Sequence, residues 1–353
     1  MIDYISIPLV AFPLIASMIL LAFVSNGTDQ IRQRLVAPIR MACLIFSLIM
    51  LTITTGMFFQ YFGDVSWMNI AFNDYEFQAK YTWIESLGIN WAVGLDALSF
   101  PMVWLTTFLL PVTIIATWNE KSGATYFPLL LMMGGALIGV FVALDLFMFY
   151  VFWELTLIPM FFLILKWGGK DRRYAAQKFF IYTFTASVVM LLGLITLYFL
   201  QDPYSLASAG TMTGRSFSIP ELIDNARAYN VGDNWYLGES MQKILFVMLM
   251  IGFLVKLPAV PFHTWLPDAH VQAPTGGSML LAGVMLKMGA YGMFRLPISL
   301  FPHALYHFQL ALMIIGMVSL VWGAIVCLGQ TNLKKMVAYS SVSHMGVILI
   351  GIA

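Results

Sequence analysis

Long apolar stretches recur along almost the whole chain, and they limit its possible folds more than any other feature. Most are close to the roughly 20 apolar residues that an α-helix needs to cross a bilayer. Hydrophobic residues make up 60% of the 353 residues and charged residues only 10%, against about 25% charged residues in soluble domains. A soluble fold of this size could not bury so much apolar surface, so lipid is expected to solvate most of it.

The stretches predict an all-α polytopic membrane protein that crosses the bilayer about ten times. The predicted spans are Ile5–Val24, Met41–Phe62, Ala97–Trp118, two spans that Asp145 separates within Tyr126–Trp167, Tyr174–Leu200, a seventh that starts near Lys243, Gly276–Phe294, Ala304–Leu328 and Leu333–Ala353. Met1–Tyr4 carries no positive charge, so the first stretch is interpreted as a retained span and not as a signal peptide. The last span ends at the final residue without a polar tail, so we expect a piece of a longer polypeptide.

The loops between the spans differ in charge. Alternate loops carry basic residues: Arg32, Arg34, Arg40, Lys121, Lys170, Arg172, Arg173, Lys334 and Lys335. Two long loops on the other side carry acidic residues: Asp64, Asp74, Glu76, Glu85, Asp202, Glu221 and Asp233. The positive-inside rule places the basic loops in the cytoplasm. The N-terminus and both long loops are therefore predicted on the outer side.

Other common functions find no support in the sequence. The net charge of +1 gives no general attraction to nucleic acid. Cys43 and Cys327 lie in separate apolar runs and do not have the spacing of a disulfide framework, a zinc site or an iron–sulfur site. The sequence also shows no nucleophile–base set and no glycine-rich phosphate loop.

Four ionisable residues lie deep inside predicted spans, where an unpaired charge costs several kcal/mol. They are Glu154, Lys256, Lys287 and His344. Each has an ordinary structural explanation: a protonated acid, a lysine that reaches the interface, an ion pair, or a hydrogen-bonded core histidine. Together they favour a path for protons or cations, because a buried lysine and a buried glutamate influence each other's protonation and histidine titrates near neutral pH.

A proline cluster follows Lys256 directly: Pro258, Pro261 and Pro267. A regular helix cannot continue through it. Broken spans are tolerated where protein or water satisfies the backbone, and in transporters they mark ion pathways. Three candidate proton-entry residues, which cytoplasmic water could reach, follow the break: His263, Asp268 and His270. Lys178 is expected to extend to the cytoplasmic face, and Asp145 to cap a helix at the outer surface.

These residues stand in motifs: Phe152–Leu155 with Pro159, Lys256–His270, Ala273–Thr275, Leu281–Gly289, Trp91–Ser99 and Tyr339–Gly346. The motifs resemble the proton-pumping antiporter-like subunits of respiratory complex I, in the family of chain M and mitochondrial subunit 4. The resemblance covers nearly the whole chain.

The resemblance implies a fold of fourteen helices built around two inverted five-helix repeats. Residues 1–125 would form three N-terminal helices with a long outer loop, residues 126–295 the first repeat, and residues 296–353 the truncated start of the second. Glu154 would modulate Lys256 on the broken seventh helix, Lys287 would be the central relay and His344 a further relay. The second broken helix, with its proton-exit acid, would be missing.

The resemblance also implies a translocating enzyme subunit of NADH:quinone oxidoreductase in the inner (plasma) membrane of a prokaryote. No cofactor is expected on this chain, because NADH, flavin, iron–sulfur clusters and quinone would bind other subunits. The expected partners are other membrane subunits, including neighbouring antiporter-like subunits and a lateral helix from another subunit, together with lipid and without nucleic acid. The alternatives are a subunit of a multisubunit Na⁺/H⁺ antiporter, of a membrane-bound hydrogenase, or of a ferredoxin- or F420-driven complex.

Overall fold

The computed structural model describes residues 6–25, 29–64, 75–119, 123–201, 215–229 and 237–353. Its helices are α1 (Ser6–Ser25), α2 (Asp29–Asp64), α3 (Ser99–Ala116), α4 (Tyr126–Val142), α5 (Leu146–Leu155), α6 (Leu157–Trp167), α7 (Arg172–Leu200), α9 (Ile219–Tyr229), α10 (Glu239–Lys256), α11 (Trp265–Gln272), α12 (Thr275–Leu280), α13 (Leu286–Met293), α14 (Pro302–Leu328) and α15 (Leu333–Ile352). Two strands, β1 (Glu76–Ile84) and β2 (Ile89–Leu95), complete the described elements with short π-helical turns at Leu281–Met285 and Phe294–Ile298. Some residues named above lie outside the described ranges: Met1, Tyr4, Ile5, Asp74, Lys121, Asp202 and Asp233.

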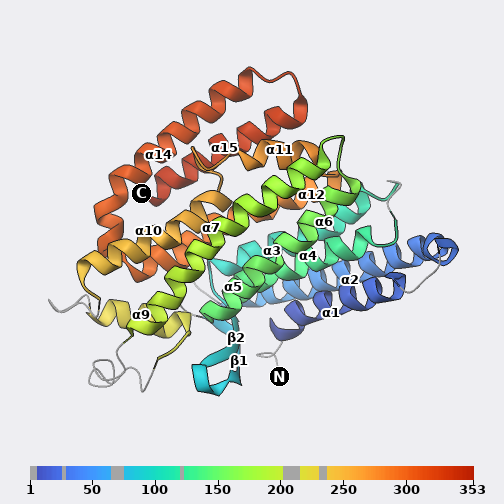
Figure 1. Cartoon of the computed structure of the whole chain (residues 1–353). Helices are drawn as coiled ribbons and strands as arrows, with labels where there is room; N and C mark the ends of the chain where they lie inside the picture. The colour runs from blue at the N-terminus through green and yellow to red at the C-terminus, as the bar shows by residue number, and fades with distance from the viewer. Residues whose placement is uncertain (1–5, 26–28, 65–74, 120–122, 202–214, 230–236) are drawn as a thin grey trace.

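Eight described helical segments are long and apolar enough to cross a membrane, and they pack side by side (Figure 1). They are Ser6–Ser25, Gln33–Tyr61, Ser99–Ala116, Leu146–Trp167, Arg172–Leu200, Thr275–Ile298, Pro302–Leu328 and Leu333–Ile352. Two further helices correspond to the remaining predicted spans: α4, which is shorter, and α10, which carries more charged residues. The predicted division at Asp145 is confirmed, because α4 ends before it and α5 starts after it.

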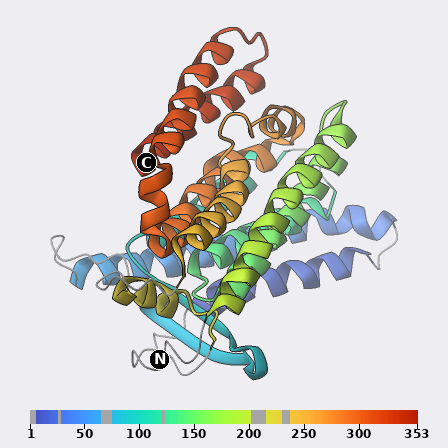
Figure 2. The ribbon, with the colours of Figure 1, turned by 60° about the vertical axis from the view of Figure 1, so that its left-hand side comes forward.

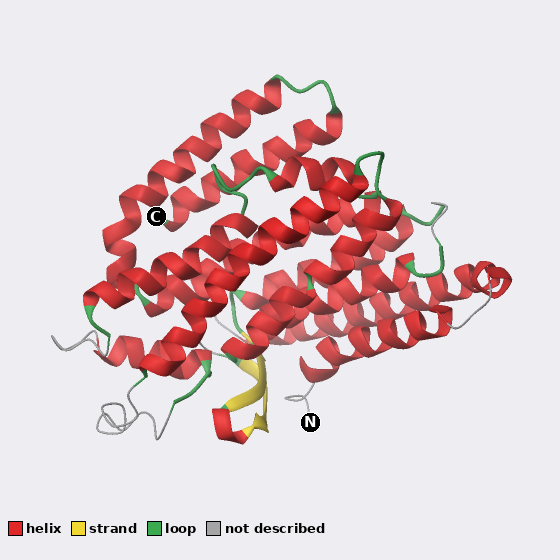
Figure 3. Cartoon of the chain, in the orientation of Figure 1, coloured by secondary structure: helices red, strands yellow, loops and turns green. Residues whose placement is uncertain are grey.

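The structure differs from the prediction mainly between the spans. Helix α2 begins at Asp29 and not near Met41, because the helix continues through polar residues that hydropathy assigns to a loop. The long loops, predicted without secondary structure, contain the antiparallel hairpin β1–β2 and the amphipathic helix α9 (Figure 3). Within the described residues, the hairpin is the sheet in an otherwise helical fold.

The hairpin lies across one end of the bundle and joins elements that are distant in sequence (Figure 2). The Ser6 hydroxyl of α1 donates to the carbonyl of Phe77, at 2.7 Å. The Tyr198 hydroxyl of α7 donates to the carbonyl of Leu87 in the hairpin turn, at 2.9 Å. We call this end, with β1, β2 and α9, the hairpin face.

The opposite end gathers basic loops that are separate in sequence. The amide of Gly169 donates to the carbonyl of Gln272, at 3.0 Å. The Lys334 ammonium donates to the carbonyl of Ala273, at 3.0 Å. The loops that precede α7 and α15 therefore lie together, as the charge pattern predicted, and we call this end the basic face.

Small residues let the helices approach closely. A Cβ atom at Gly289 of α13 would lie 2.8 Å from the backbone nitrogen of Leu257, at the end of α10. A Cβ atom at Gly346 of α15 would lie 2.6 Å from the backbone nitrogen of Leu320 in α14. Since helix association in lipid depends on close packing, these glycines set the spacing of the bundle.

The contact at Gly346 predicts opposite outcomes for two substitutions in the same helix. Gly346→Ala should lower the free energy of unfolding by about 1–3 kcal/mol, because the methyl group meets rigid backbone. Gly351→Ala, where no atom lies within 4 Å of the new Cβ, should raise it by up to about 1 kcal/mol through helix propensity. Unfolding in detergent micelles, followed by circular dichroism, measures both. Equal effects of the two variants would contradict the packing described here.

Candidate functional site

Lys256 is the last residue of α10 and is buried, with 1% of its surface exposed. Its Nζ atom lies 3.5 Å from the hydroxyl oxygen of Thr156, a long hydrogen bond. The rings of Trp153 and Phe179 lie with their centroids 5.4 and 6.0 Å from Nζ. None of the ion pairs in the described part of the chain includes Lys256. Its ammonium group is therefore held mainly by one hydroxyl and two aromatic faces.

The predicted break of the helix at Lys256 is confirmed, and protein groups satisfy the backbone around it. The carbonyl of Val255 accepts a hydrogen bond from the indole N–H of Trp265, at 2.8 Å. Beyond the break, the amide of Val260 donates to the hydroxyl of Ser319 in α14, at 2.8 Å. Unpaired backbone groups are costly inside a membrane protein, so these side chains allow the helix to end at a buried lysine.

Glu154 lies beside a second break. Helix α5 ends at Leu155 and α6 begins at Leu157, with Thr156 between them. Pro159 has no N–H for the carbonyl of Leu155, which accounts for the interruption here. Because Thr156 also receives the hydrogen bond of Lys256, the two breaks meet at this residue.

The carboxyl group of Glu154 is half-buried, and its Oε1 atom is buried without a hydrogen-bond partner among the described residues. The group interacts with the side chains of Ser187 and Tyr150 and with the charge of Lys256. Glu154 and Lys256 are thus electrostatic neighbours without a direct ion pair. A proton or a water molecule could be taken up at the open oxygen.

Lys287 lies in α13, directly after a π-helical turn. Its ammonium group donates to the carbonyl of Ala282 within that turn. Such turns free carbonyl groups and are frequent at functional sites. No described acid forms an ion pair with Lys287, so the explanation of a structural ion pair is not supported. The contact of Gly289 with Leu257 places this helix against the broken end of α10.

The residues after the break are arranged differently from the prediction. Asp268 forms an ion pair with Lys178 of α7, at 2.6 Å, so Lys178 does not extend freely to the interface. His263 and His270 are buried, and the Nδ1 atom of each is without a hydrogen-bond partner in the described chain. The expectation that both lie open to cytoplasmic water is therefore wrong for this structure.

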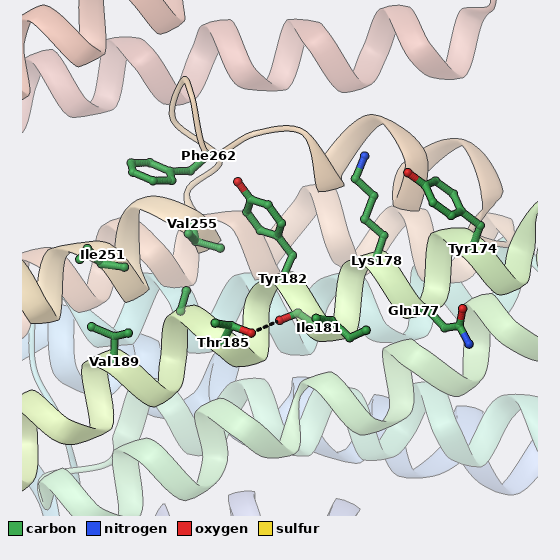
Figure 4. A pocket seen from close by; sticks show the side chains of 11 residues that line it. Tyr174, Gln177, Lys178, Ile181, Tyr182, Thr185, Val189, Ile251, Val255 and Phe262 are labelled. Atoms are coloured by element: carbon green, nitrogen blue, oxygen red, sulfur yellow. Dashed lines mark hydrogen bonds between the residues drawn. The ribbon is translucent and has the colours of Figure 1, made fainter.

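A groove of about 590 Å³ connects this region to the neighbourhood of Lys256 (Figure 4). It lies between α7 and α10. Tyr174, Gln177 and Lys178 form its polar end, and Ile251 and Val255 lie at its apolar end. The groove is lined by Val255 and not by Lys256, which stays buried behind it.

Two further predicted residues have unexpected surroundings. His344 is exposed on α15, so it is not a core histidine, and no described hydrogen bond or ion pair joins it to the other three ionisable residues. Asp145 caps α5, accepting from the amides of Phe147 and Met148, but it is buried and not at the surface. Burial raises the pKa of Asp145 to about 6, against the opposite effect of these hydrogen bonds.

Sequence reasoning missed a buried ion pair between Asp96 and Arg295. The guanidinium donates from Nη1 to Oδ2 and from Nη2 to Oδ1, both at 2.7 Å, and the side chains are 0% and 3% exposed. Nε donates to the hydroxyl of Tyr291 and Nη1 also to that of Tyr75. Asp96 accepts a further bond from the amide of Ser99, at the start of α3.

Both residues carry a signal in the sequence. Asp96 directly precedes one apolar span and Arg295 directly follows another. They are separated by 199 positions, so the sequence gives no direct indication that they meet. Tyr75 and Asp96 flank the two strands of the hairpin, so Arg295 clamps the base of the hairpin to the end of the span that contains Lys287.

Among the described residues, no group of three or more His, Cys, Asp or Glu side chains is close enough to hold a metal ion. Comparison with known proteins agrees with this picture. Residues 143–353 match the family model described as NADH:quinone oxidoreductase/Mrp antiporter, TM.

The chain belongs to this family.

Curated relatives in the family include subunit M of F(420)H(2) dehydrogenase from Methanosarcina mazei, 44% identical over 283 residues, which are 79% of this chain and 54% of the relative. NADH-quinone oxidoreductase subunit M from Rhodobacter capsulatus is 42% identical over 278 residues, 78% of this chain and 52% of the relative. The chain spans about half the length of the curated relatives it matches.

Solved structures show the same fold. Respiratory complex I from Thermus thermophilus with bound NADH contains a chain that matches with a TM-score of 0.77 and 24% identity, over 99% of this chain and 64% of that one. The Mrp complex from Dietzia sp. matches with a TM-score of 0.75 and 20% identity, over 99% and 58%. The antiporter-like fold expected from the resemblance is therefore confirmed.

Replacing either of the two buried cations, Lys256 or Arg295, by methionine should change the stability of the protein in opposite directions. Lys256→Met removes a desolvated charge that lacks an ion pair, so it should stabilise the protein by about 1–4 kcal/mol. Arg295→Met leaves the Asp96 carboxylate buried and unpaired, so it should destabilise by about 3–5 kcal/mol. Chemical unfolding in detergent measures both free energies. Lys243→Met, at an exposed pair with Glu239, is the control and should change the free energy by less than about 1 kcal/mol.

Proposed function

We propose that this chain is a proton-translocating membrane subunit of an NADH:quinone oxidoreductase of the complex I type. The observation that carries the proposal is the loose coupling of Glu154 to Lys256, a buried ammonium group whose described hydrogen bond is a long one to Thr156. A pair without a direct ion bond can change its protonation state at low cost. The relatives named NADH-quinone oxidoreductase subunit M support the same assignment.

The proposed mechanism is electrostatic. A change of charge in a neighbouring subunit shifts the protonation of Glu154, which alters the proton affinity of Lys256. The lysine releases its proton toward Lys287, against whose helix the end of α10 packs. Neutral Lys256 then takes up a new proton from the side of His263 and His270, whose buried Nδ1 atoms have no described partner and accept a proton in the tautomer that carries its hydrogen on Nε2.

The remaining parts of the proposal follow from the same assignment. His344 passes the proton onward within the full-length protein, and Asp268 takes part in proton entry when its pair with Lys178 opens. The basic face lies in the cytoplasm, and the N-terminus and the hairpin face lie outside. Residues 126–295 form the first repeat and residues 296–353 begin the second. Other subunits bind the cofactors and substrates, namely NADH, flavin, iron–sulfur clusters and quinone. Another subunit also supplies a lateral helix.

A second candidate is a subunit of an F420H2-oxidising complex. The observation that favours it is the 44% identity to the Methanosarcina mazei subunit. The proton path through this chain would be the same, and the electron donor would differ. The electron donor, and not the site on this chain, therefore distinguishes the two candidate functions.

Substitution in the assembled complex, with NADH or reduced F420 as the donor, tests the proposal. Lys256→Ala and Glu154→Gln should each lower the number of protons pumped per electron pair, because a positioned acid–base group contributes about 100-fold or more to proton transfer. Acidification of inverted membrane vesicles, measured beside donor oxidation, gives this ratio. The donor that drives acidification identifies the complex.

Lys243→Ala is the matched control, because Lys243 lies on the same helix at its exposed end and pairs with Glu239. It should leave the ratio unchanged. A wild-type ratio in both the Lys256 and the Glu154 variants would contradict the proposal. Pumping that depends on Na⁺ and not on an electron donor would indicate an antiporter subunit instead.

A further inference from the structure

Arg295, the basic member of the Asp96–Arg295 pair, lies on the same helical segment as Lys287, toward the hairpin face. Lys287 and Tyr291 are four residues apart on α13 and therefore share one face of the helix. Arg295 follows four residues later, roughly 12 Å from Lys287 along the axis. A line of polar side chains thus runs from the proposed relay lysine toward the hairpin face, and it ends at the ion pair.

The hydroxyl of Tyr291 interrupts this line as a path for protons. Its hydroxyl donates to the carbonyl of Phe141 at the end of α4, at 2.8 Å, and accepts from Nε of Arg295, at 3.1 Å. A tyrosine hydroxyl has one hydrogen to donate, and here that hydrogen is used by Phe141. Neither of these bonds is made with Lys287, so the hydroxyl does not hand a proton from Lys287 to the ion pair.

The ion pair itself cannot relay a proton. Four of the five guanidinium N–H groups are used by Asp96, Tyr75 and Tyr291. Arginine keeps its proton in proteins, and its bidentate contact occupies both oxygens of the buried Asp96 carboxylate. Lys256 and Glu154 lack such a contact, and the buried Oε1 atom of Glu154 has no hydrogen-bond partner among the described residues.

We propose that Asp96 and Arg295 form a seal that separates Lys287 from the aqueous phase at the hairpin face and so prevents protons from leaking along this half of the chain. Arg295 keeps its own proton and uses four of its five N–H groups in hydrogen bonds to Asp96, Tyr75 and Tyr291, so it neither accepts a proton nor passes one on. The proposal rests on the proposed function to the extent that Lys287 carries protons. Arg295 acts here as a positioning and insulating residue and does not take part in the transfer.

The test is the passive proton permeability of liposomes that contain the assembled complex, without electron donor. A potassium gradient with valinomycin drives the protons, and a pH-sensitive dye inside the liposomes reports their entry. The double variant Asp96→Asn with Arg295→Gln removes both charges, so no unpaired charge remains buried. Its permeability should exceed that of the wild type by about tenfold or more, because a buried charge contributes a barrier of several kcal/mol.

A third substitution separates a seal from a general distortion. Lys287→Ala in the same double variant should return the permeability to the wild-type level, because the leak needs the relay lysine. Glu221→Gln removes an exposed ion pair with Lys80 on the same face and should leave the membrane tight. A double variant as tight as the wild type, or a leak that persists after Lys287→Ala, would overturn the proposal.

Arg295→Lys keeps the positive charge and loses the bidentate fork, so it serves if the double variant does not assemble. It should leak more than the wild type, because a lysine ammonium group lacks the bidentate fork and can release its proton when buried, and an Arg295→Lys protein as tight as the wild type would also overturn the seal. The permeability assay needs no turnover and is therefore independent of the pump. Normal pumping after Lys256→Ala together with a leaky double variant would refute the proposed function and leave the seal standing. Lost pumping after Lys256→Ala together with a tight double variant would refute the seal and leave the proposed function standing.

Discussion

A charged side chain that is removed from water is stable only where other polar groups replace its hydration, and the arrangement of this bundle depends on how that need is met. Asp96 and Arg295 meet it fully, with two short hydrogen bonds to each other and further bonds to Tyr75, Tyr291 and Ser99. Lys256 meets it only in part, with the hydroxyl of Thr156 and two aromatic rings. The Asp96–Arg295 pair holds distant elements together, whereas Lys256 has no ion pair among the described residues.

The same constraint shapes the backbone. Two spans are interrupted at the point where they meet, α5–α6 at Thr156 and α10 at Lys256. An interruption within a membrane requires partners for the freed carbonyl and amide groups, and Trp265 and Ser319 supply them. Glycine at 289 then lets the segment with Lys287 pack directly against the broken end. The titratable groups are therefore brought together by local irregularities within otherwise regular helices.

Prediction from the sequence succeeded where the signal is local. Apolar stretches located the spans, and the prolines after Lys256 located the break, because both effects act over a few residues. It failed where a partner is distant in sequence. The pairing of Lys178 with Asp268, the burial of His263 and the clamp of Arg295 on the hairpin are all set by tertiary packing. The strands were missed because they lie in a polar, aromatic loop that has no apolar stretch. Helix α2 starts earlier than predicted because a helix can continue through polar residues beyond the end of an apolar stretch.

The central claim is that Glu154, and not the Asp96 of the ion pair, exchanges a proton during turnover. Infrared difference spectroscopy of the assembled complex, recorded between the oxidised and the donor-reduced states, measures carboxyl protonation directly. The expected spectrum contains a carboxylic acid C=O band that disappears in Glu154→Gln and persists in the Asp96→Asn, Arg295→Gln double variant. A band that survives in Glu154→Gln but is lost when Asp96 is replaced would contradict the assignment of the mobile and the fixed charge.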